Sequence, residues 1–155
     1  TLIVLGLEIF YFQPALVKEL SSTASALNLG TSQPAAWKGF LASFYGGIAE
    51  EILVRLFVMS FFVWSGRFIS KTSEGKPTAI VMWIANVLAA VLFGLGHLPA
   101  TALQVPLTTL VVTRAVVLNG LLGIAFGWLY WKRGLEAAMI SHFSADLVLH
   151  VLLAL

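Results

Sequence analysis

Long apolar runs separated by short polar stretches are the main pattern of this chain of 155 residues. About five of the runs are long enough to cross a bilayer, which takes roughly 20 apolar residues per helix. They cover residues 2–18, 34–64, 77–98, 107–131 and 135–155. The pattern therefore predicts an all-α fold, a polytopic bundle of about five transmembrane helices.

Polar residues and prolines mark the ends of the predicted helices. Residues 21–33 are rich in Ser, Thr, Asn and Gly, which is typical of a loop, and Pro34 suits the first turn of the helix that follows. That helix, over residues 34–64, is longer than one crossing requires, so we expect it to tilt or protrude. Pro99 and Pro106 bracket a short break before the fourth span.

The composition agrees with a membrane protein. Hydrophobic residues make up 59% of the chain and charged residues only 10%, whereas a soluble domain usually has about 25% charged residues. The length fits one domain, so we expect a single membrane-embedded domain over residues 1–155, with its functional core within residues 35–150. Thr1 stands directly in an apolar run, as expected of a fragment that lacks upstream spans.

The basic residues predict how the chain is oriented in the membrane. With about five spans, the loops after the second and fourth share a side, and the positive-inside rule makes that side the cytoplasm. These two loops carry Arg67, Lys71, Lys76, Lys132 and Arg133. Lys18 and Lys38 flank the loop on the opposite side and weaken the bias a little. The net charge of +2 does not suggest a nucleic-acid partner, and the absence of cysteine excludes disulfides, Cys-ligated zinc and a cysteine nucleophile.

Several ionisable residues lie inside the predicted spans, where a charge at the bilayer centre costs about 2.5–3.5 kcal/mol on insertion scales. Such residues usually face the interior of a bundle, pair with one another and mark a functional site. They are Glu50, Glu51, Arg55, His97, Arg114, His142, Asp146 and His150.

The second span carries two adjacent glutamates. Glu51 and Arg55 are four residues apart, so they can pair along one helix face, while Glu50 lies about 100° around the helix and can point into a cavity. Gly46 and Gly47 allow another helix to approach closely. An ion pair that only fixes helix packing is the alternative interpretation, but it needs no second carboxylate.

The third and fifth spans bring histidines. His97 stands near a span end, where a lone histidine is more often a hydrogen-bonded interfacial residue. His142, Asp146 and His150 repeat every four residues and form one polar stripe, which is also typical of a helix–helix contact; His150 is best explained as an interfacial group. Together, however, three spans each supply a carboxylate or an imidazole, and these groups can activate a water and stabilise an oxyanion.

Three short motifs resemble, in order and spacing, those of the CPBP family of CAAX-protease and bacteriocin-processing membrane proteins, also called the ABI or Rce1-like family. They are Glu50-Glu51-x-x-x-Arg55, Phe93-x-x-x-His97 and His142-x-x-x-Asp146. The resemblance covers about two-thirds of the chain. It implies an intramembrane glutamic endopeptidase without a metal or other cofactor, multi-pass in a prokaryotic cell membrane, that acts on a peptide or membrane-protein substrate, lipidated or not.

The resemblance also implies a role for each motif residue. Glu50 would be the general base, helped by His97 in activating the attacking water. Glu51 and Arg55 would shape the site and support that base, and His142 would donate a hydrogen bond to the tetrahedral oxyanion.

Asp146 departs from the Rce1-type pattern, which has Asn at this position. Asn can donate a hydrogen bond to an oxyanion, whereas an ionised Asp would repel it. Asp146 must therefore be protonated through burial or must orient His142 instead. We favour orientation, because the i, i+4 spacing allows direct contact between the two side chains.

Other functions predict different observations. A metalloprotease would use Glu50, His97, His142 and Asp146 as ligands, although the chain has no His-Glu-x-x-His pair, and it would lose activity under strong chelation. A transporter or proton relay also uses buried Glu and His, but no inverted repeat is evident. A non-catalytic membrane adaptor, for example in bacteriocin immunity, is expected to have lost one of the three motifs.

The sequence leaves the depth of the site open. His142 lies roughly 12 Å along its helix from the Lys132–Arg133 loop, whereas His97 lies about 30 Å along its helix from Pro77. Equal depths then require protruding helices, tilt or a bent third span. The side from which a substrate enters is not fixed by the sequence.

Overall fold

The computed structural model describes residues 1–27 and 36–152. Over these residues the chain is helical and contains no strand, which confirms the predicted all-α class. The first helical stretch consists of α1 (Leu2–Leu7), the π-helical segment η1 (Glu8–Phe12) and α2 (Gln13–Leu27). The second consists of α3 (Ala36–Phe44), the π-helical segments η2 (Tyr45–Glu50) and η3 (Ile52–Met59), and α4 (Ser60–Gly66).

Three further stretches complete the bundle. They are α5 (Ala79–Gly96) with the short α6 (Leu98–Ala102), then α7 (Thr109–Arg133), then α8 (Leu135–Leu147) continued by the π-helical segment η4 (Val148–Leu152). In the part of the chain that is described, three helices are long and apolar enough to cross a membrane: Ala79–Ala102, Thr109–Arg133 and Leu135–Leu152.

The helix ends follow local sequence signals in most places. Thr78 and Thr108 cap α5 and α7, because each hydroxyl accepts a hydrogen bond from the backbone N–H three residues later. Gly134 joins α7 to α8 with a φ of 94°, a conformation that residues with a Cβ rarely adopt. These signals make the α7–α8 connection a tight turn.

Two predicted boundaries need correction. The loop expected over residues 21–33 is wrong in its first half, because α2 continues to Leu27. Ser and Thr are poor but tolerated helix residues, and the first glycine of this stretch comes only at Gly30. Residues 28–33 and Pro34 lie outside the described residues. The break between Pro99 and Pro106 is partly helical, because Pro99 occupies the first turn of α6, where proline is tolerated.

Close packing of α5 on α7 forms the centre of the molecule. A Cβ added to Gly94 would lie 2.9 Å from Val116 Cα, and one added to Gly123 would lie 3.1 Å from Ala90 Cβ. One apolar core joins α1 and η1 to α7 and α8, and a second joins η3 to α5 through Val54, Met59, Ala85, Ala89 and Phe93. Small residues therefore let these helices approach closely, as is usual inside membranes.

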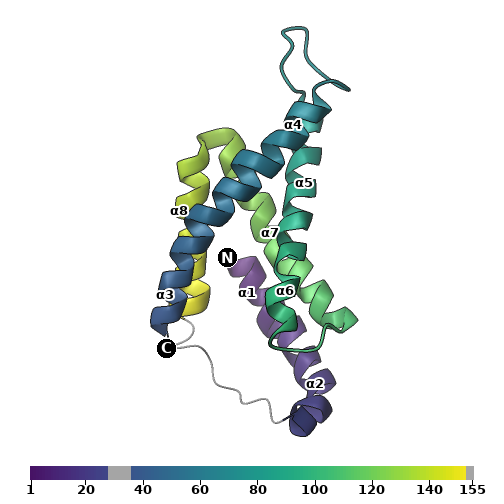
Figure 1. Ribbon diagram of the computed structural model, residues 1–155, viewed down its shortest axis with the longest axis vertical. Helices are drawn as coiled ribbons and strands as arrows, with labels where there is room; N and C mark the ends of the chain where they lie inside the picture. The colour runs from purple at the N-terminus through teal and green to yellow at the C-terminus, as the bar shows by residue number, and fades with distance from the viewer. Residues whose placement is uncertain (28–35, 153–155) are drawn as a thin grey trace.

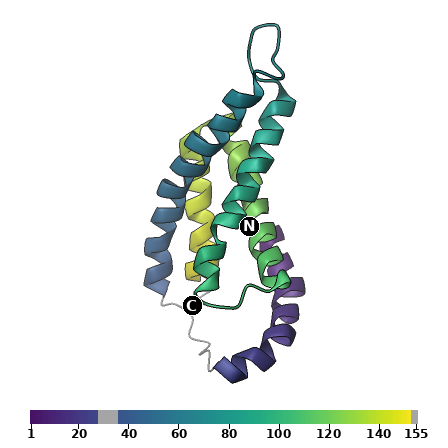
Figure 2. The same cartoon turned by 45° about the vertical axis from the view of Figure 1, so that its right-hand side comes forward.

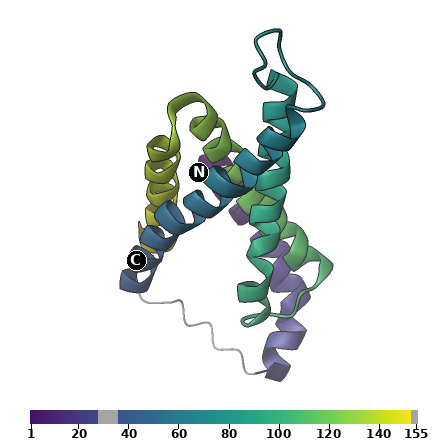
Figure 3. The same cartoon turned by 45° about the horizontal axis from the view of Figure 1, so that its top comes forward.

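The helical stretch over residues 36–66 runs diagonally across the bundle (Figures 1 and 3). Its first half packs on α8 and η4, and its second half packs on α5. The loop between α4 and α5 projects at one end of the molecule, beyond the α7–α8 turn (Figures 1 and 2). The sequence placed His97 farther along its helix from the preceding loop than His142. The diagonal path accounts for this difference, because the middle of the diagonal helix reaches α8 while its end lies beside the start of α5.

Candidate active site

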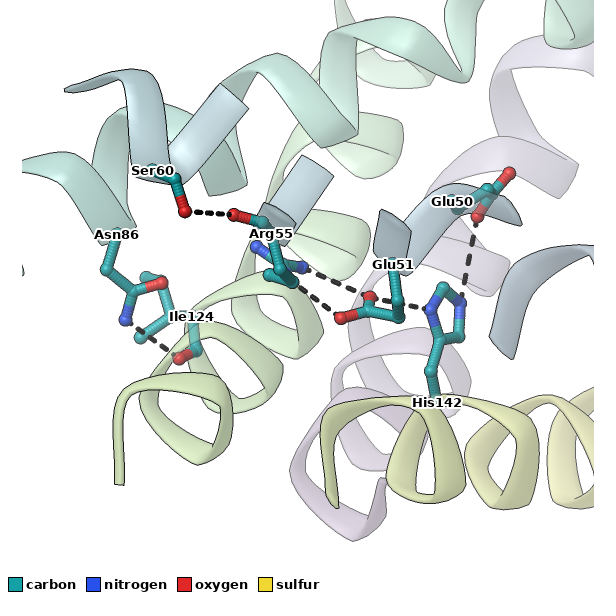
Figure 4. A network of polar contacts seen from close by, with 7 residues as sticks. All are labelled: Glu50, Glu51, Arg55, Ser60, Asn86, Ile124 and His142. Carbon is teal, nitrogen blue, oxygen red and sulfur yellow. Dashed lines mark hydrogen bonds and ion pairs between the residues drawn. The ribbon is translucent and has the colours of Figure 1, made fainter. Parts of the chain in front are cut away.

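Glu51, Arg55 and His142 form a hydrogen-bonded chain in the interior, which we call the buried triad (Figure 4). Arg55 Nε donates to Glu51 Oε2 at 2.9 Å, and Glu51 Oε1 lies 2.9 Å from His142 Nδ1. Glu51 and Arg55 are fully buried, and His142 is 4% exposed. Because Glu51 is paired with a guanidinium, it is a carboxylate, and the Nδ1–H of His142 is the donor toward it.

The local backbone brings α8 against the glutamates. Gly46 and Gly47 are buried in η2, one helical turn before Glu50. A Cβ on Gly46 would collide with the Asp146 carboxylate and lie 3.1 Å from His142 Nε2, and one on Gly47 would lie 2.9 Å from Phe143 Cβ. The close approach predicted for these two glycines is confirmed, and its partner is α8.

Two further carboxylates face the other nitrogen of His142. Nε2 lies 3.8 Å from Glu50 Oε2 and 3.7 Å from Asp146 Oδ1. These distances exceed those of a hydrogen bond, so the contacts are electrostatic. The side chains of Glu50 and Asp146 are 24% and 15% exposed, whereas that of Glu51 is fully buried. The side chain that holds the His142 ring by a hydrogen bond is therefore Glu51, from another helix, and Asp146 lies beyond hydrogen-bonding distance.

His97 approaches this cluster from the end of α5. Its Nδ1 lies 2.8 Å from the Phe93 carbonyl oxygen and donates to it, which leaves Nε2 as an acceptor. Within the described residues, no hydrogen bond or ion pair joins His97 to Glu50. The Phe93 ring lies between the two histidines, edge-on to His97 at 4.7 Å and to His142 at 5.5 Å.

Sequence reasoning missed two aromatic contacts of the site. Phe126 of α7 stacks on the His142 ring at 4.7 Å, and Phe93 lies 5.7 Å from the Arg55 guanidinium. Phe93 was visible in its motif, but its role as a common neighbour of three site residues was not. The sequence gave no indication that Phe126 contacts His142, because aromatic residues in apolar spans usually serve only in packing.

Polar partners elsewhere in the bundle were also missed. Arg114 pairs with Glu8 of η1 through two hydrogen bonds of 2.8 and 2.9 Å. Asn86 is fully buried on α5 and donates to the Ile124 carbonyl at 3.0 Å. Glu8 could have been found as an acidic residue inside the first apolar run. The His150 side chain is exposed, and the backbone carbonyl of His150 packs closely against Gly39 of α3.

The polar side chains of the site can be compared with the ligand sets of metal centres. Over residues 1–27 and 36–152, no three His, Asp or Glu side chains are grouped so that they could hold a metal ion. The buried Glu51 carboxylate holds the His142 ring by a hydrogen bond. Two partly exposed carboxyl groups, those of Glu50 and Asp146, lie beside the other nitrogen of this ring, and His97 supplies a second imidazole.

A sequence model of the family described as type II CAAX prenyl endopeptidase Rce1-like matches residues 32–148. The chain belongs to this family. The matched segment contains all three motifs, so the resemblance seen in the sequence is confirmed. Family membership makes the chain an integral membrane protein of a peptidase family that acts on peptide or protein substrates in a membrane. Comparisons with curated protein sequences and with solved structures found no match.

Proposed function

We propose that this chain is a multi-pass intramembrane endopeptidase of a prokaryotic cell membrane, in which Glu50 activates the attacking water. The observation that carries the proposal is the difference between the two adjacent glutamates. Both oxygens of Glu51 are occupied by Arg55 and His142, and its side chain is fully buried. Glu50 has no such partner and is partly exposed, so it is the carboxylate that can take a proton from water.

His142 supplies the stabilisation of the oxyanion in this proposal. Its Nδ1–H is held by Glu51, so Nε2 is directed toward the space beside Glu50 and Asp146. A neutral ring would present only a lone pair there, and donation to an oxyanion requires a second proton on Nε2. The carboxyl groups of Glu50 and Asp146 each lie within 4 Å of this nitrogen. Asp146 lies 3.7 Å from Nε2, so in this proposal it borders the space that the oxyanion occupies.

His97 completes the proposed mechanism as a second acceptor. Its Nδ1–H is fixed on the Phe93 carbonyl, so its Nε2 lone pair is free to accept a hydrogen bond from the water. Glu50 and His97 come from different helices, and in this proposal both contact the same water, which orients it for attack on a peptide carbonyl. Hydrolysis then needs no metal.

Cleavage by purified protein in detergent tests this function. The probe is an internally quenched peptide, with and without a farnesyl thioether at its C-terminal cysteine, which also measures dependence on lipidation. Glu50→Gln and His97→Ala should abolish cleavage, and both should unfold at the temperature of the parent. His150→Ala is the matched control on the stripe that contains His142 and should cleave at the parental rate. Parental cleavage by both site variants would refute the mechanism, and loss of cleavage under strong chelation would favour a metalloprotease.

A further inference from the structure

Within the part of the chain that is described, a hydrogen bond holds only one of the two ring nitrogens of His142. Nδ1 lies 2.9 Å from Glu51 Oε1, whereas Nε2 lies 3.7 Å from Asp146 and 3.8 Å from Glu50, beyond hydrogen-bonding distance. Carboxylate oxygens accept hydrogen bonds over a broad range of directions, and the terminal torsion of a histidine side chain has broad energy minima. The bond to Glu51 therefore fixes the position of Nδ1 and leaves the tilt of the ring, and with it the direction of Nε2, to other contacts.

A second contact on the His142 ring comes from Phe126 of α7. The two ring centroids lie 4.7 Å apart and the ring planes are inclined by 19°, so the rings are stacked face to face. Phe93 of α5 also meets the imidazole, but edge-on at 5.5 Å. Tilting the imidazole would push one of its edges into the Phe126 ring. The stack therefore restrains the motion that the hydrogen bond leaves free.

The α7–α8 hairpin brings these two rings to the same depth. Gly134 forms the turn, and Phe126 and His142 are each eight residues from it along the sequence. Both residues therefore lie about 12 Å along their helices from the turn. On α8, Ala138 and Ala145 share the buried face with His142, and their small side chains let α7 approach the imidazole. The short turn and the two alanines thus favour the stack.

The ring of Phe126 is itself held firmly. Its side chain is 3% exposed. Leu118, Leu122 and Phe126 repeat every four residues along α7, so they share one helix face, and all three belong to the apolar core that also contains Ala138 and Ala145. Side chains in such a core are closely packed and have little room to move. Phe126 can therefore act as a fixed wall against which the imidazole rests.

We propose that Phe126 is a positioning residue for His142, because its stack and the hydrogen bond to Glu51 together direct Nε2 into the space beside Glu50. The proposal rests on the proposed endopeptidase function, in which Nε2 donates to the oxyanion. The oxyanion forms only when the peptide carbonyl is attacked, so a displaced Nε2 weakens binding of the transition state and not of the peptide substrate. Loss of the stack therefore lowers kcat and leaves KM nearly unchanged.

Two substitutions at residue 126 separate the flat ring from the space that it fills. Phe126→Leu keeps an apolar side chain without a ring, and Phe126→Tyr keeps the ring. With the internally quenched peptide in detergent, we expect kcat to fall about 10- to 100-fold in Phe126→Leu, the effect expected of a displacement of about 1 Å. KM should stay near the parental value, and Phe126→Tyr should recover most of the parental kcat. If gel filtration shows that Phe126→Leu does not fold, Phe126→Met takes its place.

Leu118→Ala is the matched control for loss of packing. Leu118 belongs to the same core as Phe126, about two helical turns away along α7. Its truncation leaves a cavity, so the unfolding temperature should fall at least as far as in Phe126→Leu, while kcat should remain parental. Equal losses of kcat in Phe126→Leu and Leu118→Ala would overturn the proposal, because loss of packing would then explain both.

Nuclear magnetic resonance measures the ring position without requiring activity. A proton over the face of an aromatic ring is shifted upfield by the ring current. The chain has three histidines, so in protein with isotope-labelled histidine the Cε1–H signal of His142 is assigned by its loss in His142→Gln. We expect this signal to move in Phe126→Leu and to stay near its parental position in Phe126→Tyr and Leu118→Ala.

The two measurements distinguish failure of this proposal from failure of the proposed function. Parental kcat in Phe126→Leu overturns the positioning role, and so does a His142 signal that stays at its parental position in that variant. If the parent protein cleaves no peptide, the proposed function fails, whereas the His142 signal still decides whether Phe126 holds the imidazole.

Discussion

At the scale of single residues, Glu50 and Glu51 are adjacent in the sequence but have different surroundings. Glu51 accepts hydrogen bonds from Arg55 and His142 and is fully buried. Glu50 lies 3.8 Å from His142 Nε2, and its side chain is 24% exposed. A carboxylate that is already fully hydrogen-bonded contributes to the structure of the site, and one that meets solvent is available for proton transfer.

This difference predicts that the two isosteric variants fail in different ways. Glu51→Gln leaves Arg55 as an unpaired buried cation, and breaking a buried pair in this way costs about 3–5 kcal/mol. Glu50→Gln removes a partly exposed charge and should leave the free energy of unfolding nearly unchanged while abolishing cleavage. Thermal unfolding in detergent, read beside peptide cleavage, separates the two effects. Equal losses of stability in both variants would contradict the assignment of Glu50 as the base.

A second prediction at this scale concerns Gly46. In Gly46→Ala the new methyl group meets the Asp146 carboxylate and the His142 ring, so both must move away from residue 46 and out of their positions in the site. Ala is also the better helix former by about 1 kcal/mol, which offsets the loss of stability. We therefore expect kcat to fall more than the unfolding temperature. Gly6→Ala is the control, because nothing lies within 4 Å of a Cβ at Gly6; parental kcat in Gly46→Ala would refute this role.

The sequence predicted which residues share a helix face, but not how the faces meet. The pairing of Glu51 with Arg55 and the close approach at Gly46 follow from helical periodicity, and both are confirmed. The hydrogen bond between Glu51 and His142 joins residues 91 positions apart and depends on the angle at which two helices cross. Periodicity does not contain that angle, so the choice of Glu51 over Asp146 as the partner of His142 required the structure.

At the scale of helices, one amide and one glycine add a polar contact to the close packing of α5 on α7 around Gly94 and Gly123. Asn86 Nδ2 donates to the Ile124 carbonyl, and a Cβ at Gly127 would collide with Asn86 Oδ1. His97 is eleven residues after Asn86, which is close to three full turns, so the two side chains lie on the same face of α5. The contact between Asn86 and Gly127 therefore contributes to the orientation of the helix face that carries His97.

The pair predicts a non-additive result in a double-mutant cycle. Gly127→Ala alone should be destabilising, because the added methyl group meets the buried amide. Asn86→Ala alone loses one hydrogen bond, which costs about 0.5–1.5 kcal/mol. The double variant should be more stable than Gly127→Ala, since the shortened side chain leaves room for the methyl group. Gly120→Ala is the control, because its Cβ meets only the Ala90 carbonyl oxygen at 3.8 Å; strictly additive changes in unfolding free energy would exclude this coupling.

Helix boundaries show where the sequence was a reliable guide. The caps at Thr78 and Thr108 and the glycine at position 134 act through the backbone next to them, and these helix ends agree with the sequence. The extension of α2 to Leu27 was missed, because a polar composition indicates exposure and does not by itself end a helix. The diagonal path of the second helical stretch was expected only as tilt or protrusion, since its direction depends on contacts with both α8 and α5.

At the scale of the whole molecule, apolar packing and the ion pair between Glu8 and Arg114 join the first helical stretch to the rest. Val4 and Phe12 belong to the same core as α7 and α8. Between them, Glu8 and Arg114 form two parallel hydrogen bonds, the geometry in which a guanidinium binds a carboxylate most strongly. Both side chains are partly exposed, 37% for Arg114 and 22% for Glu8, and each lies within an apolar helical run.

This setting predicts that each charge depends on the other. Glu8→Gln or Arg114→Gln alone leaves one charge without a partner in an apolar environment, and we expect a loss of about 1.5–3 kcal/mol, as for hydrogen bonds to charged groups. The double variant removes both charges and should recover part of that loss in thermal unfolding. The pair between Lys76 and Glu74 has the same length of 2.8 Å, but its side chains are 75% and 70% exposed in the α4–α5 loop. Lys76→Gln should therefore change stability by less than about 1 kcal/mol. If the double variant is less stable than both single variants, the ion pair does not hold the first helix on α7, and apolar packing alone accounts for its position.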